Sequence, residues 1–170
     1  MANFSDVILW ILKQEDSTLS GRVVDLGDGQ GLTRYGIAQH SQTALPPDFY
    51  VAAPATALTY AKVVYRGEYW DAILGDEILD TSLAATLMSY AVNDGVSRAV
   101  KILQGLLGLM QDGEFGAQTL MAVNAANAVT LATELREAQA AWYRTVVANN
   151  PADARFLDGW LARAARIYPN

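Results

Sequence analysis

One segment constrains the fold more than any other. The run LAATLMSYAV, residues 83–92, is apolar on nearly every side of a helix, and a helix of this kind has to be surrounded by other elements. Thr81 or Ser82 can begin it, and Asn93-Asp94-Gly95 breaks it. The chain is therefore expected to fold as an all-α protein around this central helix.

Apolar residues recur at helical spacing on both sides of that segment. Asn3 can cap the first helix, Pro54 suits the first position of the second, Gly67 is expected to close the second, and Ser97 can cap a later one. The expected helices cover residues 4–15, 54–66, 97–108, 118–126, 130–147 and 154–167. The one convincing β signal is a small hairpin or glycine-rich loop near residues 22–37, where β-prone runs flank DLGDGQG.

The amino-acid composition argues against several classes of site and partner. The 170 residues are 52% hydrophobic and 18% charged, enough for one core or two small subdomains that share one. Without cysteine, disulfides and thiolate metal sites are excluded. The net charge of -6 argues against a nucleic-acid partner and suits an anionic wall polymer poorly, although Arg155, Arg163 and Arg166 make the last segment basic.

The first residues, MANFSDVILWILKQED, have no positively charged start and no small-residue cleavage site. No apolar run reaches the roughly 20 residues of a membrane helix. We expect a protein made in the cytoplasm without a signal peptide and without membrane insertion. A substrate outside the inner membrane would require a separate release route.

A candidate carboxylate site lies between residues 15 and 37. Glu15 ends an apolar amphipathic segment, and Asp25, Asp28 and Thr33 follow in or after the glycine-rich turn. A carboxylic acid held partly protonated can act as a general acid while a second polar group fixes a water, which is what cleavage of a glycosidic bond needs. Alternatively, Glu15 is only the solvated end of a helix and the glycines only form a hairpin.

Other chemistries are excluded by their missing residues. A calcium loop over residues 25–36 would need glutamate where Gly36 stands, and the glycines lack the Lys-Ser/Thr of a phosphate loop. His40 is the only histidine and no nucleophile elbow is present, so a surface loop position is expected for it. We expect no cofactor and no metal.

Aromatic and amide side chains are candidates for contacts to a sugar polymer. Tyr35, Tyr65, Tyr69 and Trp70 belong more often to a core than to a binding surface, yet such rings also stack on sugars. Asn93 either ends the central helix or contacts a substrate amide.

Together these landmarks resemble the glycoside hydrolase family 108 lysozymes, which include secretion-activator and phage endolysin proteins. The family motifs are E-G-G, D-P-G-G-x-T-x-x-G-I, YR-x-x-YW and V-N-x-G, followed by L-Q…DG-x-x-G-x-x-T-L-x-A-V-N in a C-terminal predicted peptidoglycan-binding part. In this sequence they fall in order at Glu15, 28–37, 65–70, 92–95, 103–104, 112–120 and 122–124, with a G-W-L-x-R ending at 159–163.

The resemblance implies a lysozyme-like fold that hydrolyses the β-1,4 bond between N-acetylmuramic acid and N-acetylglucosamine in peptidoglycan. By this resemblance Glu15 is the general acid, Asp28 orients or activates a water, and Thr33 helps to hold that water. We expect burial at the end of the apolar helix to raise the pKa of Glu15, while Asp28 stays ionised in an exposed loop. Asp25, Tyr35, Tyr69 and Asn93 are the candidate substrate contacts.

Three positions depart from the family pattern. Asp16 and Ser17 replace the two glycines, and Ser89 stands where the family has an aspartate before V-N-x-G. The segment from Glu15 to Thr33 is also longer than usual, which leaves Asp25 as a competitor of Asp28.

The sequence thus predicts a monomeric peptidoglycan hydrolase with a catalytic part at residues 1–92 and a helical peptidoglycan-binding part at 93–170 packed on it. Two alternatives keep the fold. One is a wall-binding structural component that has lost activity, and the other is a lytic transglycosylase that uses Glu15 as both acid and base.

Overall fold

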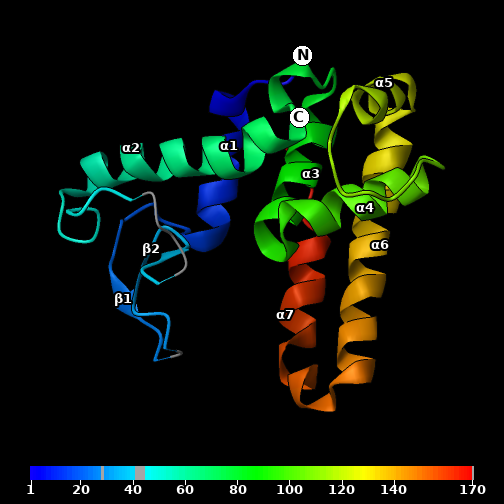
Figure 1. Cartoon of the computed structure of the whole chain (residues 1–170). Coiled ribbons are helices and arrows are strands. Elements are labelled where there is room, and N and C mark those ends of the chain that lie inside the picture. Colours follow the sequence, from blue (N-terminus) through cyan, green and yellow to red (C-terminus); the bar gives the residue numbers. More distant parts are fainter. Residues whose placement is uncertain (28, 41–44, 170) are drawn as a thin grey trace. The chain divides into compact units, whose positions relative to one another are not determined.

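A computed structural model describes residues 1–27, 29–40 and 45–169. Within these ranges the chain is mainly helical, with seven α-helices and one small antiparallel sheet, so the expected all-α class with a small hairpin is confirmed (Figure 1). The residues divide into two compact units. One consists of Phe4–Trp70, and the other of Met1–Asn3 together with the chain from Asp71 onward.

The Phe4–Trp70 unit begins with helix α1, Phe4–Glu15. Its apolar stripe is buried along one face, as the 3.6-residue spacing predicts: Phe4, Val7, Ile8, Ile11 and Leu12. The three-stranded sheet follows in the order β1 (Val24–Asp25), β2 (Leu32–Arg34) and β3 (Ile37–Ala38). Helix α2, Pro54–Tyr65, completes the unit and begins at its proline, as expected.

The second helix ends differently from the prediction. Gly67 does not close it, because the chain continues from α2 into a π-helical turn, η1 (Arg66–Trp70), that contains this glycine. The prediction from Gly67 was therefore wrong. The turn buries Trp70 against Phe4, with ring centroids 5.7 Å apart, and this contact outweighs the low helical propensity of one glycine.

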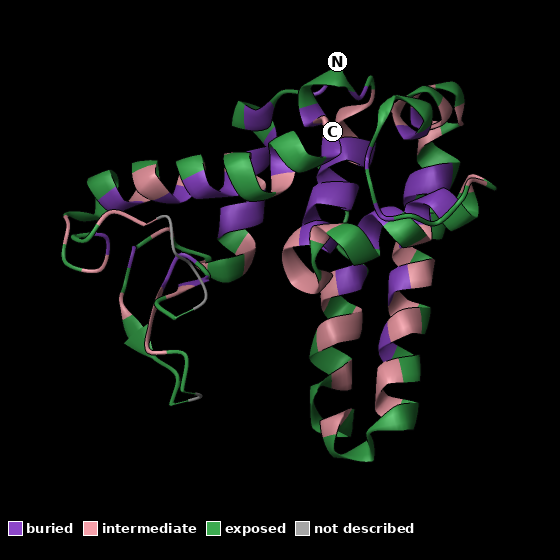
Figure 2. Cartoon of the chain, viewed as in Figure 1, coloured by how far each residue is buried: buried purple, intermediate pink, exposed green. Residues whose placement is uncertain are grey.

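The other unit is built on α3, Thr81–Asp94, whose residues 83–91 are all buried and appear as an almost continuous purple segment in Figure 2. Two 3-10 turns, η2 (Asp71–Ile73) and η3 (Gly75–Glu77), precede it. Around it lie α4 (Val96–Leu106), α5 (Ala117–Ala125) and α6 (Ala128–Asn149), and the turn η4 (Pro151–Asp153) joins α6 to α7 (Ala154–Ala164), which packs on α6. The expected central helix is present.

Helices α3 and α4 begin with different kinds of N-cap. The side chain of Asp80 caps α3 by accepting a hydrogen bond from the Leu83 amide. Ser97 does not cap α4, because Gly95 occupies the cap position with φ +87° and no side-chain bond. Helix α4 therefore begins at Val96, before the predicted cap at Ser97, since a glycine can take a positive φ without steric cost.

The L-Q…DG motif has a structural explanation. The Gln104 side chain, buried on α4, donates from Nε2 to Asp112 Oδ1 at 2.7 Å and to the Glu114 carbonyl at 3.1 Å. Its Oε1 accepts from the Gly113 amide at 3.0 Å. One buried amide thus holds the loop between α4 and α5. No helix in the described ranges is long and apolar enough to cross a membrane.

Candidate active site

A pocket of about 490 Å³ opens in the Phe4–Trp70 unit, where α1 ends beside the sheet. It brings together two of the three predicted catalytic residues, Glu15 and Thr33, with Tyr35 and Gly36 of the β2–β3 turn. Its other lining residues come from the loop after α1 and from β1: Asp16, Ser17, Thr18, Ser20, Arg22, Val24 and Leu26. The acid and hydroxyl that the motif separates by 17 residues therefore face one polar pocket.

The turn between β2 and β3 lies against the Glu15 side chain. Arg34 pairs with Ile37, and the two residues between them, Tyr35 and Gly36, have φ of +50° and +76°, as a two-residue type I′ turn requires. A Cβ placed on Gly36 would lie 2.7 Å from Glu15 Cγ and 2.7 Å from the Tyr65 hydroxyl. Glycine is needed here both for its positive φ and for the room that it leaves to Glu15.

Thr33 contributes an unpaired hydroxyl to the pocket. Its Oγ1 is buried and has no hydrogen-bond partner among the described residues. A buried hydroxyl without a partner costs about 1–3 kcal/mol of stability. Such a cost is characteristic of functional sites, where the missing partner is a water or a ligand.

The loop after α1 is held by Asp16, one of the departures from the family motif. Its carboxylate accepts hydrogen bonds from the Gly21 amide at 2.8 Å, from Ser20 Oγ at 3.1 Å, and from the amide and hydroxyl of Thr18. Partial burial raises the pKa of Asp16, but these hydrogen bonds outweigh burial and leave the pKa below its usual value. Asp16 therefore holds this loop through hydrogen bonds to an ionised carboxylate. The family motif has flexible glycines in this segment instead.

Arg34 joins the sheet to the rest of this unit. Its buried guanidinium donates from Nε to the Gly21 carbonyl at 2.7 Å, and from Nη1 to the carbonyls of Phe49 at 2.7 Å and Ala52 at 2.9 Å. Lysine offers one nitrogen and cannot reproduce this fork. The sequence analysis did not identify Arg34, because its acceptors are carbonyls 13 to 18 positions away and leave no side-chain signature.

The predicted tyrosine contacts differ in their surroundings. The Tyr35 ring is buried, and its hydroxyl donates to the carbonyls of Leu19 and Pro54, so it supports the loop at the edge of the pocket. Tyr65 is likewise buried and donates to the Tyr35 carbonyl at 3.0 Å. Tyr69 is half-buried, with its ring 5.6 Å from that of Tyr65. Its contact with a substrate stays a prediction.

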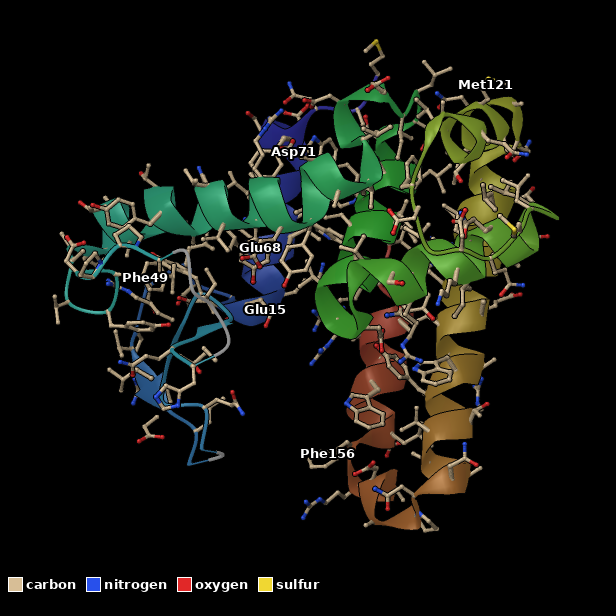
Figure 3. The ribbon with its side chains drawn as sticks, viewed as in Figure 1. Glu15, Phe49, Glu68, Asp71, Met121 and Phe156 are labelled. Carbon is tan, nitrogen blue, oxygen red and sulfur yellow. The ribbon has the colours of Figure 1, made fainter. Side chains whose placement is uncertain are left out.

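Glu68 is a second acid in this region that the sequence analysis missed. Burial raises the pKa of Tyr69, and the charges of Glu68 and Glu15 raise it further, so both carboxylates lie within electrostatic range of that ring. Figure 3 labels the two acids. Glu68 comes from the π turn η1, a rare conformation that is frequent at functional sites.

The candidate supporting acids are Asp25 and Asp28. Asp28 lies outside the described residues. Asp25 is exposed, its Oδ1 accepts from the Gly27 amide at 2.9 Å, and its neighbours Val24 and Leu26 line the pocket. His40 is exposed, as expected, with Nδ1 3.1 Å from the Gly29 carbonyl.

Glu15 and Asn93 have surroundings that differ from those predicted. Glu15 is exposed, so the expected desolvation at the end of the apolar helix is wrong for this structure. The helix buries its stripe up to Leu12, and Glu15 lies beyond it at the pocket. Asn93 belongs to the other unit, where its Nδ2 donates to the Ser89 carbonyl at 2.7 Å and its Oδ1 accepts from Arg163 Nη1 at 2.6 Å. Its amide is engaged in joining α3 to α7.

A mainly helical protein with a glutamate at the end of its first helix, a small hairpin beside it and a polar pocket between them has the construction of a lysozyme-like glycosidase. The chain belongs to glycosyl hydrolase family 108, whose model matches residues 9–95, just over half of its length. A second model, described as a predicted peptidoglycan domain, matches residues 98–165. The two matches together identify a lysozyme-like protein that acts on peptidoglycan.

Among solved structures the chain is similar to SagA of Brucella abortus. The two share 28% sequence identity with a TM-score of 0.73, over 96% of this chain and 90% of that one. A comparison with curated proteins gave no match.

Proposed function

We propose that this protein is an N-acetylmuramidase that hydrolyses the β-1,4 bond between N-acetylmuramic acid and N-acetylglucosamine, with Glu15 as general acid. The observation that carries the proposal is that Glu15 shares one pocket with Thr33, whose buried hydroxyl has no partner among the described residues. A water held by Thr33 would satisfy that hydroxyl and lie in the same pocket as the acid.

Glu15 would be activated by the substrate rather than by the free protein. Because its carboxyl is exposed, water surrounds it until a glycan strand covers the pocket. Removal of that water favours the protonated acid, which can then protonate the leaving oxygen. The rigid turn under Glu15 and the capped loop beside it keep the carboxyl at the pocket while this occurs.

A second carboxylate activates the water in this scheme. We assign that role to Asp28, with Asp25 as the competitor. Asp25 accepts a hydrogen bond from the amide of Gly27 at the start of the same loop, so it also has a structural role there.

The enzyme acts as a monomer on the periplasmic wall, after holin-type or another release from the cytoplasm.

The test is digestion of purified sacculi by wild type, Glu15→Gln and Glu134→Gln. Glu134 is an exposed acid on α6 and provides the same chemical change away from the pocket. Loss of a general acid is expected to slow the release of soluble fragments by about 10²–10⁴-fold, with Glu134→Gln like wild type. Asp28→Asn and Asp25→Asn, compared in parallel, separate the two supporting acids.

Mass spectrometry of the products distinguishes the chemistries. A muramidase leaves reducing N-acetylmuramic acid ends, whereas anhydro-muramic ends would identify a lytic transglycosylase. Equal activity of Glu15→Gln and wild type would remove Glu15 from the mechanism. Binding to sacculi without any product would favour a structural wall component.

A further inference from the structure

A second pocket lies wholly within the unit that begins at Asp71. It measures about 420 Å³ and is formed where α3 passes into α4, with one wall from α6. Its charged and apolar lining residues are Asp94, Arg98, Lys101, Ile102 and Trp142. Nothing in the proposed hydrolysis uses these residues.

Two cations form one side of this pocket. The Arg98 guanidinium lies over the Trp142 ring, 3.9 Å from its centroid, and Lys101 follows three positions later on the same helix. The side chains of Arg98 and Lys101 make no hydrogen bond or salt bridge with any other residue that the structure describes, although Lys101 lies within electrostatic range of Asp112. The aromatic face orients the guanidinium without neutralising it, and leaves its N–H groups for an anion.

One acid, Asp94, also lines this pocket. Asp94 Oδ2 accepts from Gln139 Nε2 at 2.9 Å and from the Tyr143 hydroxyl at 2.7 Å, and both donors are neutral. Burial and the bond to Asp94 raise the pKa of Tyr143, so it remains a donor. The carboxylate is thus fixed in place.

A buried hydroxyl lies close to both charges. Tyr90 is fully buried, and its hydroxyl has no partner among the described residues. Burial raises its pKa, Asp94 raises it further and Arg98 lowers it, so the hydroxyl lies within electrostatic range of the two sides of the pocket. Tyr90 does not line the pocket, so the assignment of a ligand rests on the charged side chains that do.

We propose that this pocket binds the zwitterionic end of a diamino acid in a peptidoglycan stem peptide. Arg98 and Lys101 bind the carboxylate of this end, Asp94 binds its ammonium group, and Ile102 and Trp142 contact the aliphatic chain that leads from it to the peptide. The proposal rests on the proposed function only in taking peptidoglycan as the substrate.

The arrangement of charges favours this ligand over the other components of a cell wall. A neutral glycan would offer no anionic group to Arg98 or Lys101. A phosphate polymer would meet Asp94 and a chain with a net charge of -6. A group with both signs satisfies both sides of the pocket, and each mismatch leaves a charge unpaired.

The experiment is calorimetric titration of the full chain, carrying Glu15→Gln, with the tripeptide L-Ala-γ-D-Glu-meso-diaminopimelate. The variants are Arg98→Gln combined with Lys101→Gln, and the matched control is Arg144→Gln, an exposed arginine on α6 outside this pocket. Arg98 and Lys101 are exposed, so their replacement leaves the core intact. Loss of the charge-assisted bonds should weaken binding about ten- to a hundred-fold, with the control unchanged.

Two results would overturn the proposal: a double variant that binds the tripeptide as the control does, or a wild-type pocket that takes peptide-free glycan strands or a phosphate polymer in its place. Because no cleavage is needed, tripeptide binding by a protein that releases nothing from sacculi would refute the hydrolase while leaving this site standing.

Discussion

Replacement of Gly36 by alanine tests whether the β2–β3 turn positions Glu15. An L-residue at a φ of +76° costs about 1–2 kcal/mol of folding free energy. The new Cβ would also lie 2.7 Å from Glu15 Cγ, so the Glu15 stem must move by roughly 0.8 Å to restore an ordinary carbon contact of about 3.5 Å. The Tyr65 hydroxyl, bonded to the Tyr35 carbonyl, blocks the other direction.

The expected result is a loss of activity beyond the loss of stability. A displacement approaching 1 Å of a catalytic group can cost about 10²-fold in rate, so Gly36→Ala should digest sacculi some ten- to a hundred-fold more slowly than wild type. Gly108→Ala is the matched control, because Gly108 has φ +68° and nothing within 4 Å of its added Cβ. Both variants should unfold at temperatures lower by roughly 2–8 °C.

The assay is turbidity loss of purified sacculi at a temperature where circular dichroism shows both variants folded. If Gly36→Ala then digests sacculi as fast as Gly108→Ala, the contact between the turn and Glu15 does not position the acid, and the reasoning fails.

Four further predictions concern single contacts. Thr33→Val should keep or raise the unfolding temperature, because it removes a buried unpaired hydroxyl, and should lower the rate of sacculus digestion; a less stable protein with full activity would contradict the role given to this hydroxyl. Arg34→Lys should lose roughly 3 kcal/mol in a denaturant titration, since a single ammonium nitrogen cannot take the separate positions of Nε and Nη1, and an unchanged midpoint would show that the fork contributes nothing. Gln104→Leu should cost roughly 2–3 kcal/mol by the same measurement, because the Gly113 amide loses its acceptor; no change would mean that water replaces it. The folded-state pKa of Asp16 is lowered, so its carboxylate stabilises the protein above its ordinary pKa of about 3.9, and this contribution is lost as pH falls through the lower folded value; wild type should therefore exceed Asp16→Asn in stability at pH 7 and converge with it in acid, and a constant difference across that range would count against the ionised cap.

Local sequence determined most of the helical framework. The spacing of Phe4, Val7, Ile8, Ile11 and Leu12 predicted the buried stripe of α1, and the apolar run of residues 83–92 predicted the central helix α3. Both signals depend only on neighbours within a few turns of one helix. Pro54 likewise marked the start of α2, because its fixed φ suits the first helical position.

The motifs indicated which residues belong to the pocket, and only tertiary structure decided their surroundings. Glu15 and Thr33 meet because β2 returns beside the end of α1, and the same fold leaves Glu15 exposed and the Thr33 hydroxyl buried. Burial depends on what packs from elsewhere in the chain, which residue spacing does not record.

The long-range contacts were beyond the sequence altogether. Arg34 acts on carbonyls, Asn93 is engaged by Arg163 from 70 positions away, and Arg98 lies over Trp142 on another helix. Periodicity and turn propensity are properties of short segments, whereas these contacts form only when whole helices pack against one another. The sequence by itself thus determined which elements form, and the packing between them decided which polar groups are engaged and which are left for a ligand.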